Sequence, residues 1–183
     1  MDIFRFIQKI KTHLQLSFNE VDGWFEKDKK TLDHQPSNGG WTVRQILEHL
    51  YLTNFYLLIL IEKGSRKALR NSGGLEIRNY VFDREKFEKV GEYGAFEWIR
   101  PNHMEPKGEM ELHEIRSLIS MQHEQCLIYL DRMKNGEGLL CRTTMTVNGL
   151  GKINVYEYIY FFSLHTRRHL TQMKNNESEL EKP

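Results

Sequence analysis

Apolar side chains recur every three or four residues in four separate segments of this chain, and this period matches one face of an α-helix. In the first segment, residues 3–30, charged side chains fall mainly between the apolar ones. The apolar members of this stripe are Ile3, Ile7, Ile10, Leu14, Phe18, Val21 and Phe25. The pattern returns over residues 42–63, 111–134 and 154–174. Because amphipathic helices must bury their apolar faces against one another, the sequence predicts an all-α fold, a four-helix bundle.

Capping residues mark where two of these helices begin. Thr42 can cap the second helix, and Gln45, three residues later, completes a capping box. Asn154 and Glu157 have the same spacing at the start of the fourth helix. Gly64 is expected to end the second helix, because glycine is favoured just past a helix C-terminus.

The connection between the second and third helices, residues 64–110, is long for a compact domain and rich in Gly and Pro. We expect a crossover there, with a short helix near residues 83–90. In residues 136–153, Asn148-Gly149 could turn a small hairpin. The crossover permits an up-down-down-up helix order, in which the second and fourth helices are antiparallel, while a simple up-down-up-down order remains an alternative.

The length and charge of the chain limit its organisation and its partners. With 183 residues it fits one domain, expected over residues 1–175, followed by a polar C-terminal tail over 176–183. Lys and Arg number 26 and Asp and Glu 25, which gives a formal net charge of +1. Nucleic-acid binders usually show a basic excess, so we expect no nucleic-acid partner.

No segment of the sequence has the pattern of an export signal or a membrane span. Charged residues interrupt the N-terminal segment, which lacks the apolar run of a signal peptide. The longest apolar run, residues 55–61, is far shorter than the ~20 residues that a membrane span needs. Cys126 and Cys141 make no disulfide framework and are expected to be reduced thiols. These features predict a cytoplasmic protein without a membrane partner.

Three histidines are the candidate metal ligands. His165 and His169 lie four residues apart in the fourth helix, so their Cβ atoms are ~5–6 Å apart on one face and both rings can reach one ion. An isolated pair of this kind could equally be a polar or interface pair. His49 also faces inward, and one cation could satisfy all three rings, since each unsatisfied buried polar group costs ~1–3 kcal/mol. Arg167 and Arg168 are expected to point elsewhere.

The remaining histidines show weaker patterns. His113 and His123, ten residues apart on the third helix, project ~80° apart, which indicates surface or boundary positions. His103 could lie over the mouth of a site, although a plain loop position is the preferred interpretation. His13 and His34 have no useful spacing.

No residue is identified as catalytic, because none is a convincing general base. Glu48 lies next to a candidate ligand but points ~100° away from it, and Glu157 is better explained as a capping residue. Gln172 and Tyr158 could line a cavity, and Trp41 could form one of its walls. For the two aromatic residues, packing in the core is the preferred interpretation.

Two segments resemble a known family. Residues 40–50, Gly-Trp-Thr-Val-Arg-Gln-Ile-Leu-Glu-His-Leu, are similar to the second helix of the DinB/YfiT-like superfamily. Residues 151–172 resemble its final helix, with the His-Thr-Arg-Arg-His motif at 165–169. The resemblance implies an up-down-down-up four-helix bundle, often a homodimer. It also implies that His49, His165 and His169 bind a divalent metal ion, usually nickel or zinc, and leave positions open for water or substrate.

The resemblance also limits the expected function. Some members of this superfamily transfer or isomerise groups with low-molecular-weight thiols such as bacillithiol or mycothiol, and others are described as metal-dependent hydrolases. We therefore expect a metal-dependent enzyme of the thiol S-transferase or hydrolase type, acting on a small molecule. A non-catalytic dimeric module for stress response or binding, stiffened by its metal, is the alternative. A helical interaction protein without metal is a third reading.

Overall fold

The computed structural model describes residues 2–72, 80–96 and 101–180 and is mostly helical. The helices in these ranges are α1 (Ile3–Trp24), α2 (Lys29–Asp33), α3 (Val43–Arg70), α4 (Arg84–Glu88), α5 (Leu112–Arg132) and α6 (Val155–Leu180). Strands β1 (Arg142–Met145) and β2 (Gly151–Asn154) form a small antiparallel sheet. No helix within the described ranges has the length and apolar character needed to cross a membrane. The all-helical expectation is correct apart from this small sheet.

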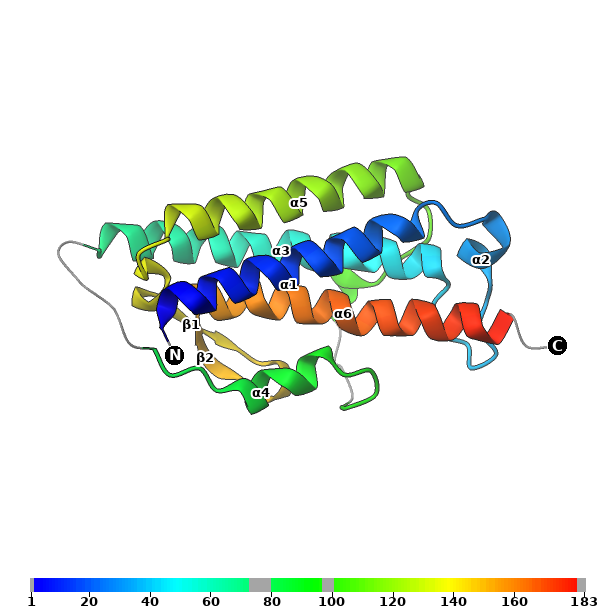
Figure 1. Cartoon of the computed structure of the whole chain (residues 1–183). Helices are drawn as coiled ribbons and strands as arrows, with labels where there is room; N and C mark the ends of the chain where they lie inside the picture. Colours follow the sequence, from blue (N-terminus) through cyan, green and yellow to red (C-terminus); the bar gives the residue numbers. More distant parts are fainter. Residues whose placement is uncertain (1, 73–79, 97–100, 181–183) are drawn as a thin grey trace.

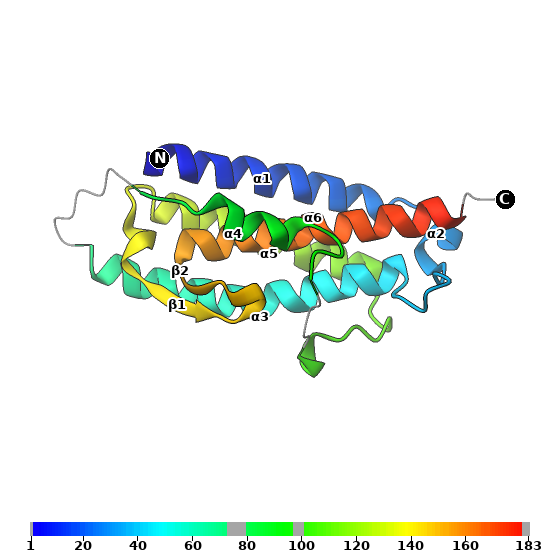
Figure 2. The ribbon, with the colours of Figure 1, turned by 90° about the horizontal axis from the view of Figure 1, so that it is seen from below.

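Four long helices lie side by side and form the body of the molecule (Figure 1). Helix α1 packs against α5 and α6, and α3 packs against the same two helices. Following the colours of Figure 1, α1 and α6 run in one direction, and α3 and α5 run in the other. Helix α4 and the hairpin of β1 and β2 lie below this body in Figure 1 and in front of it in Figure 2, and both contact α6. Helices α3 and α6 are therefore antiparallel neighbours.

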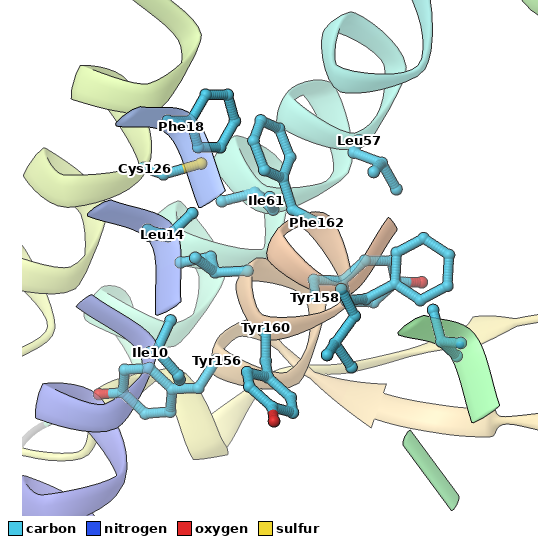
Figure 3. Close-up of a cluster of buried hydrophobic side chains, with 14 of the residues drawn as sticks. Ile10, Leu14, Phe18, Leu57, Ile61, Cys126, Tyr156, Tyr158, Tyr160 and Phe162 are labelled. Carbon is cyan, nitrogen blue, oxygen red and sulfur yellow. The ribbon is translucent and has the colours of Figure 1, made fainter. Parts of the chain in front are cut away.

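The apolar faces of the four long helices meet in one core (Figure 3). The labelled side chains of this core are Ile10, Leu14 and Phe18 of α1, Leu57 and Ile61 of α3, Cys126 of α5, and Tyr156, Tyr158, Tyr160 and Phe162 of α6. The rings of Phe18 and Phe162 stack with their centroids 5.4 Å apart, which joins α1 to α6. Burial of such large side chains is the main source of stability for helices that would be marginal alone.

Both expected capping boxes are present. The Thr42 hydroxyl accepts a hydrogen bond from the Gln45 amide, and the Gln45 side chain accepts one from the Thr42 amide. Asn154 and Glu157 exchange the equivalent pair of bonds, at 3.1 and 2.7 Å. The Tyr80 hydroxyl also donates to Glu157, so this carboxylate ties the crossover to the start of α6. Local sequence signals thus set the start of α3 and of α6.

Three predicted helix ends were wrong. The first helix ends at Trp24, and the separate short helix α2 follows, capped by Asp28. Helix α3 continues through Gly64 as far as Arg70. Helix α6 continues to Leu180, although residues from 176 onwards were expected to be a polar tail. The side chain of Asn176 is buried and donates to the Trp41 carbonyl at 2.8 Å, which explains why α6 extends.

The two connections contain the expected elements. Helix α4 lies within the predicted range 83–90 of the crossover. The hairpin pairs Arg142 with Asn154 and Met145 with Gly151. Its turn places Asn148 and Gly149 at φ values of 46° and 64°, a left-handed backbone that these two residue types adopt more readily than others.

Gly64 allows close packing between α3 and α6 rather than ending a helix. A Cβ atom at this position would lie 3.0 Å from a methyl carbon of Val155, whereas one at Gly23 of α1 would meet nothing within 4 Å. Gly23→Ala should therefore raise the free energy of unfolding by ~0.4–1 kcal/mol, since alanine restricts the unfolded chain. Gly64→Ala should give no such gain, because overpacking opposes it. Urea unfolding of both variants measures the contrast, and equal gains would contradict this packing role.

Candidate metal centre

Three histidines from two helices meet inside the molecule. His49 lies in the second turn of α3, and His165 and His169 lie in consecutive turns of α6. Their candidate ligand nitrogens lie within 4.8 Å of one another, and the side chains are only 3%, 1% and 6% exposed. Helices α3 and α6 pack against each other in opposite directions, and this packing brings the three rings together. The structure thus brings together the three residues that the sequence singled out.

The spacing of the two α6 histidines suits a shared ion. The Nε2 atoms of His165 and His169 are 3.1 Å apart, and the two ring planes cross at 73°. Two nitrogens that bind one zinc-sized ion at ~2.0–2.1 Å lie about 3 to 3.5 Å from each other. Since His49 has ring centroid distances of 5.3 and 4.8 Å to the two partners, its ring closes the third side of the cluster.

Hydrogen bonds on the far side of two rings fix which nitrogen faces the cluster. The Nδ1 atom of His49 lies 2.8 Å from the carbonyl oxygen of Met104, and Nδ1 of His169 lies 2.9 Å from Oε1 of Gln172. Because these oxygens only accept, each Nδ1 must carry the proton and donate it. The Nε2 lone pairs then point inward, as in metal sites whose histidines are oriented by a carbonyl or a carboxylate.

Burial keeps His165 uncharged. Loss of solvation lowers the pKa of His165 well below its ordinary value, and the neighbouring His169 and His49 lower it further. The imidazole of His165 is therefore neutral at neutral pH. Neutral imidazole is the form that binds a metal ion.

Glu48 supports the site from outside it. Its buried carboxylate accepts hydrogen bonds from the backbone amides of Lys107 and Gly108, at 3.2 and 2.5 Å. As the sequence predicted, it points away from the cluster. It anchors the segment that includes Met104, whose carbonyl holds His49. Glu48 is therefore a positioning residue rather than a base.

A cavity of about 490 Å³ opens onto the three histidines. Its apolar wall includes Leu57, Leu60, Met145, Val147 and Phe161, and its polar wall includes Thr53, Tyr56, Thr146 and Gln172. The Thr53 hydroxyl lies 3.4 Å from Nε2 of His49, so a polar side chain adjoins the cluster. A volume of this size accommodates a small organic molecule.

Arg168 also lines this cavity, although the sequence predicted that it points elsewhere. Its guanidinium donates to the carbonyl of Glu92 at 2.5 Å and lies over the rings of Tyr93 and Phe96. These three residues belong to an irregular part of the crossover. Because that part has no periodic pattern, its packing against Arg168 could not be predicted from the sequence.

The other candidate residues lie outside the cluster. Tyr158 donates to the Thr144 carbonyl and is part of the core, as preferred. Trp41 packs on His49 with ring centroids 4.6 Å apart, so it does flank the site. His103 is exposed and contacts Tyr56, which is itself a cavity residue, at a ring distance of 4.2 Å.

The remaining histidines have separate surroundings. His123 stacks on Phe18, and burial lowers its pKa. His13 packs edge-on against Tyr160, and His113 is exposed. His34 lies 3.8 Å from Glu179. None of these histidines joins the buried cluster.

Comparison with known proteins agrees with this geometry. The sequence model of the DinB superfamily matches residues 19–173, a range that holds all three clustered histidines and the cavity. No curated protein and no solved structure gives a significant match. On the family match, the chain belongs to the DinB superfamily.

Proposed function

We propose that this protein is a metal-dependent enzyme that holds a divalent ion, nickel or zinc, between His49, His165 and His169. The observation that carries the proposal is the contact between the buried histidine cluster and a cavity large enough for a small molecule. Structural zinc sites usually take four protein ligands, whereas catalytic sites take three and keep a position open. The cluster of three histidines has the ligand number of a catalytic site.

We also propose that the fold is an up-down-down-up four-helix bundle. Two observations support this order: the shared direction of α1 and α6, and the packing of both α1 and α3 on α5 and α6. The long connection between α3 and α5 provides the crossover that such an order needs.

Among the enzyme classes, thiol transfer is favoured over hydrolysis. A bound divalent ion would supply Lewis-acid chemistry, deprotonating a coordinated thiol or acidifying a coordinated water. Hydrolysis usually needs a side chain as general base, as the glutamate in metalloproteases. No aspartate or glutamate is among the described residues that line the cavity. The proposed substrate pair is therefore a small thiol and an electrophilic acceptor.

The surrounding residues would orient the ligands and limit access of water. Met104 and Gln172 orient the rings of His49 and His169. The two side chains would therefore lose little conformational freedom when a metal ion or substrate binds. The apolar side chains of Leu57 and Phe161 line the same cavity and keep part of it dry. The Thr53 hydroxyl adjoins His49 and can donate a hydrogen bond to a bound molecule.

Metal analysis of tag-free protein tests the proposal directly. We expect about one divalent ion per chain by elemental mass spectrometry, since the three histidines form one site. The loaded protein should then turn over members of a panel of small thiols and electrophiles. If no divalent ion copurifies or rebinds, the metal proposal is wrong. If metal binds but nothing in the panel turns over, the enzyme proposal is wrong.

The second candidate function is a non-catalytic homodimeric module that its metal stiffens. Exposed apolar side chains on adjacent helices favour it: Phe55 of α3 and Met121 and Ile128 of α5 are 47%, 62% and 42% exposed. The Gln122 side chain donates to the Tyr51 carbonyl, which places these parts of α3 and α5 together. A second copy of the chain could cover this surface. Dimeric mass by light scattering, with metal bound and no turnover, would favour this module.

A further inference from the structure

Among the described residues that line the cavity beside the histidine cluster, Arg168 is the one strongly basic side chain. The other described lining residues are apolar, hydroxyl-bearing, amide-bearing or histidine side chains, and none is an aspartate or a glutamate. Imidazole binds a metal ion as a neutral ligand, so the three histidines would not offset the charge of a divalent ion. The cavity therefore combines two sources of positive potential with no acidic side chain among its described lining.

Contacts with the crossover hold the guanidinium of Arg168 in place. It donates to the Glu92 carbonyl, and its central carbon lies 5.5 and 5.7 Å from the ring centroids of Tyr93 and Phe96. A carbonyl and two rings orient a guanidinium without removing its charge. A fixed cation in a partly apolar cavity attracts an anion more strongly than one in water does.

We propose that Arg168 binds the anionic group of a small, partly apolar acid whose other end reaches the histidine cluster. The inference rests on the proposed metal site and specifies the class of ligand that this site takes. A carboxylate suits the guanidinium because the two planar groups can form parallel hydrogen bonds. Leu57 and Phe161, in the same cavity, would contact the apolar part of the ligand. Arg168 is thus a specificity residue for an acidic thiol over a neutral one.

A matched pair of thiols tests this preference. Cobalt-loaded protein would be titrated with 3-mercaptopropionate and with its methyl ester, and binding would be followed by the absorption band of thiolate on cobalt. We expect the acid to bind at least ~10-fold more tightly, because only its carboxylate can form charge-assisted hydrogen bonds with the guanidinium. Equal affinity for the acid and the ester would overturn the proposal.

Three variants separate a ligand contact from a structural role. Arg168→Met should remove the preference for the acid, and Arg168→Lys should keep part of it. Arg167→Met is the matched control: it removes the same charge one residue away, from an exposed side chain outside the cavity lining, and should keep the full preference. An Arg168→Met variant that folds, binds cobalt and still prefers the acid would contradict the inference.

A readout without metal keeps this inference separate from the proposed function. The Nε–H signal of Arg168 can be identified by nitrogen-15 NMR as the arginine signal that is missing from the Arg168→Lys variant. In metal-free protein, phenylacetate should shift this signal and phenylacetamide should not. Failure to bind any metal would refute the metal site alone, whereas an Arg168 signal that responds to neither or to both molecules would refute the anion site.

Discussion

His169→Ala should weaken binding of a divalent ion by more than ~100-fold, because loss of a partner in the outer shell of a metal site already costs 10–100-fold. His169 is itself a proposed ligand, and its Nε2 atom lies 3.1 Å from Nε2 of His165. The surrounding residues cannot replace it, since no described lining residue offers a carboxylate. Competition with a coloured chelator, titrated against each protein, measures the change.

Thermal unfolding gives a second measure of the same effect. An ion at about 100 times its Kd adds ~2.7 kcal/mol to the folded state, which corresponds to a rise in Tm of ~5–10 °C for a chain of this size. The wild type should show this rise, and His169→Ala should not. His113→Ala, which changes an exposed histidine on α5, should behave as the wild type. A metal-dependent rise of equal size in all three proteins would place the ion elsewhere.

Glu48→Ala should lower both stability and metal affinity, although Glu48 is not a proposed ligand. Its carboxylate accepts from two backbone amides, and leaving such groups without an acceptor costs ~1–3 kcal/mol each, less where water can enter. We therefore expect a loss of ~2–4 kcal/mol in the free energy of unfolding, measured in urea. The released segment carries the carbonyl that orients His49, so metal affinity should fall ~10–100-fold.

Glu62→Ala is the matched control for this variant. Glu62 lies on the same helix and pairs with Arg66 one turn later, at the surface. Exposed pairs of this kind contribute ~0.3–0.5 kcal/mol, so the change should be small and metal affinity should stay the same. If Glu48→Ala lowers stability but leaves metal affinity intact, then the Met104 segment does not position His49.

The helices and the histidine cluster could be predicted from the sequence because local patterns encode them. The capping boxes of Thr42 and Asn154 depend only on residues three positions apart. The four-residue spacing of His165 and His169 fixes their shared face on any helix. His49 could be added because its position on the inward face of α3 follows from the same periodicity.

The helix ends could not be predicted because distant contacts decide them. The local sequence predicts that Gly64 ends a helix. Helix α3 nevertheless continues past it, because α6 packs closely over Gly64 near Val155. The polar residues in the last turns of α6 predict an unstructured tail. Asn176 is nevertheless buried, and its side chain donates a hydrogen bond to the Trp41 carbonyl. Neither partner is near in sequence, so no local pattern could reveal the contact.

The place of Arg168 in the wall of the cavity was missed for the same reason, although Gln172 was correctly expected to line a cavity. Arg168 stands beside a candidate ligand, and helix geometry alone turns its Cβ away from that face. Its long side chain nevertheless reaches the cavity, where Glu92 and Tyr93 of the crossover hold it. Such an irregular segment has no period from which its packing could be derived.

The partners of the histidine cluster have a consequence for how the molecule folds. His49 relies on a carbonyl 55 residues further along, and Glu48 on an amide 60 residues away, while the final turns of α6 hold the backbone just before α3. Contacts of such long range form late, since the entropy of closing large loops opposes them. An ion shared by His49 and the α6 histidines would therefore bind only after α6 has packed against α3, so it would stabilise the finished fold rather than start its folding.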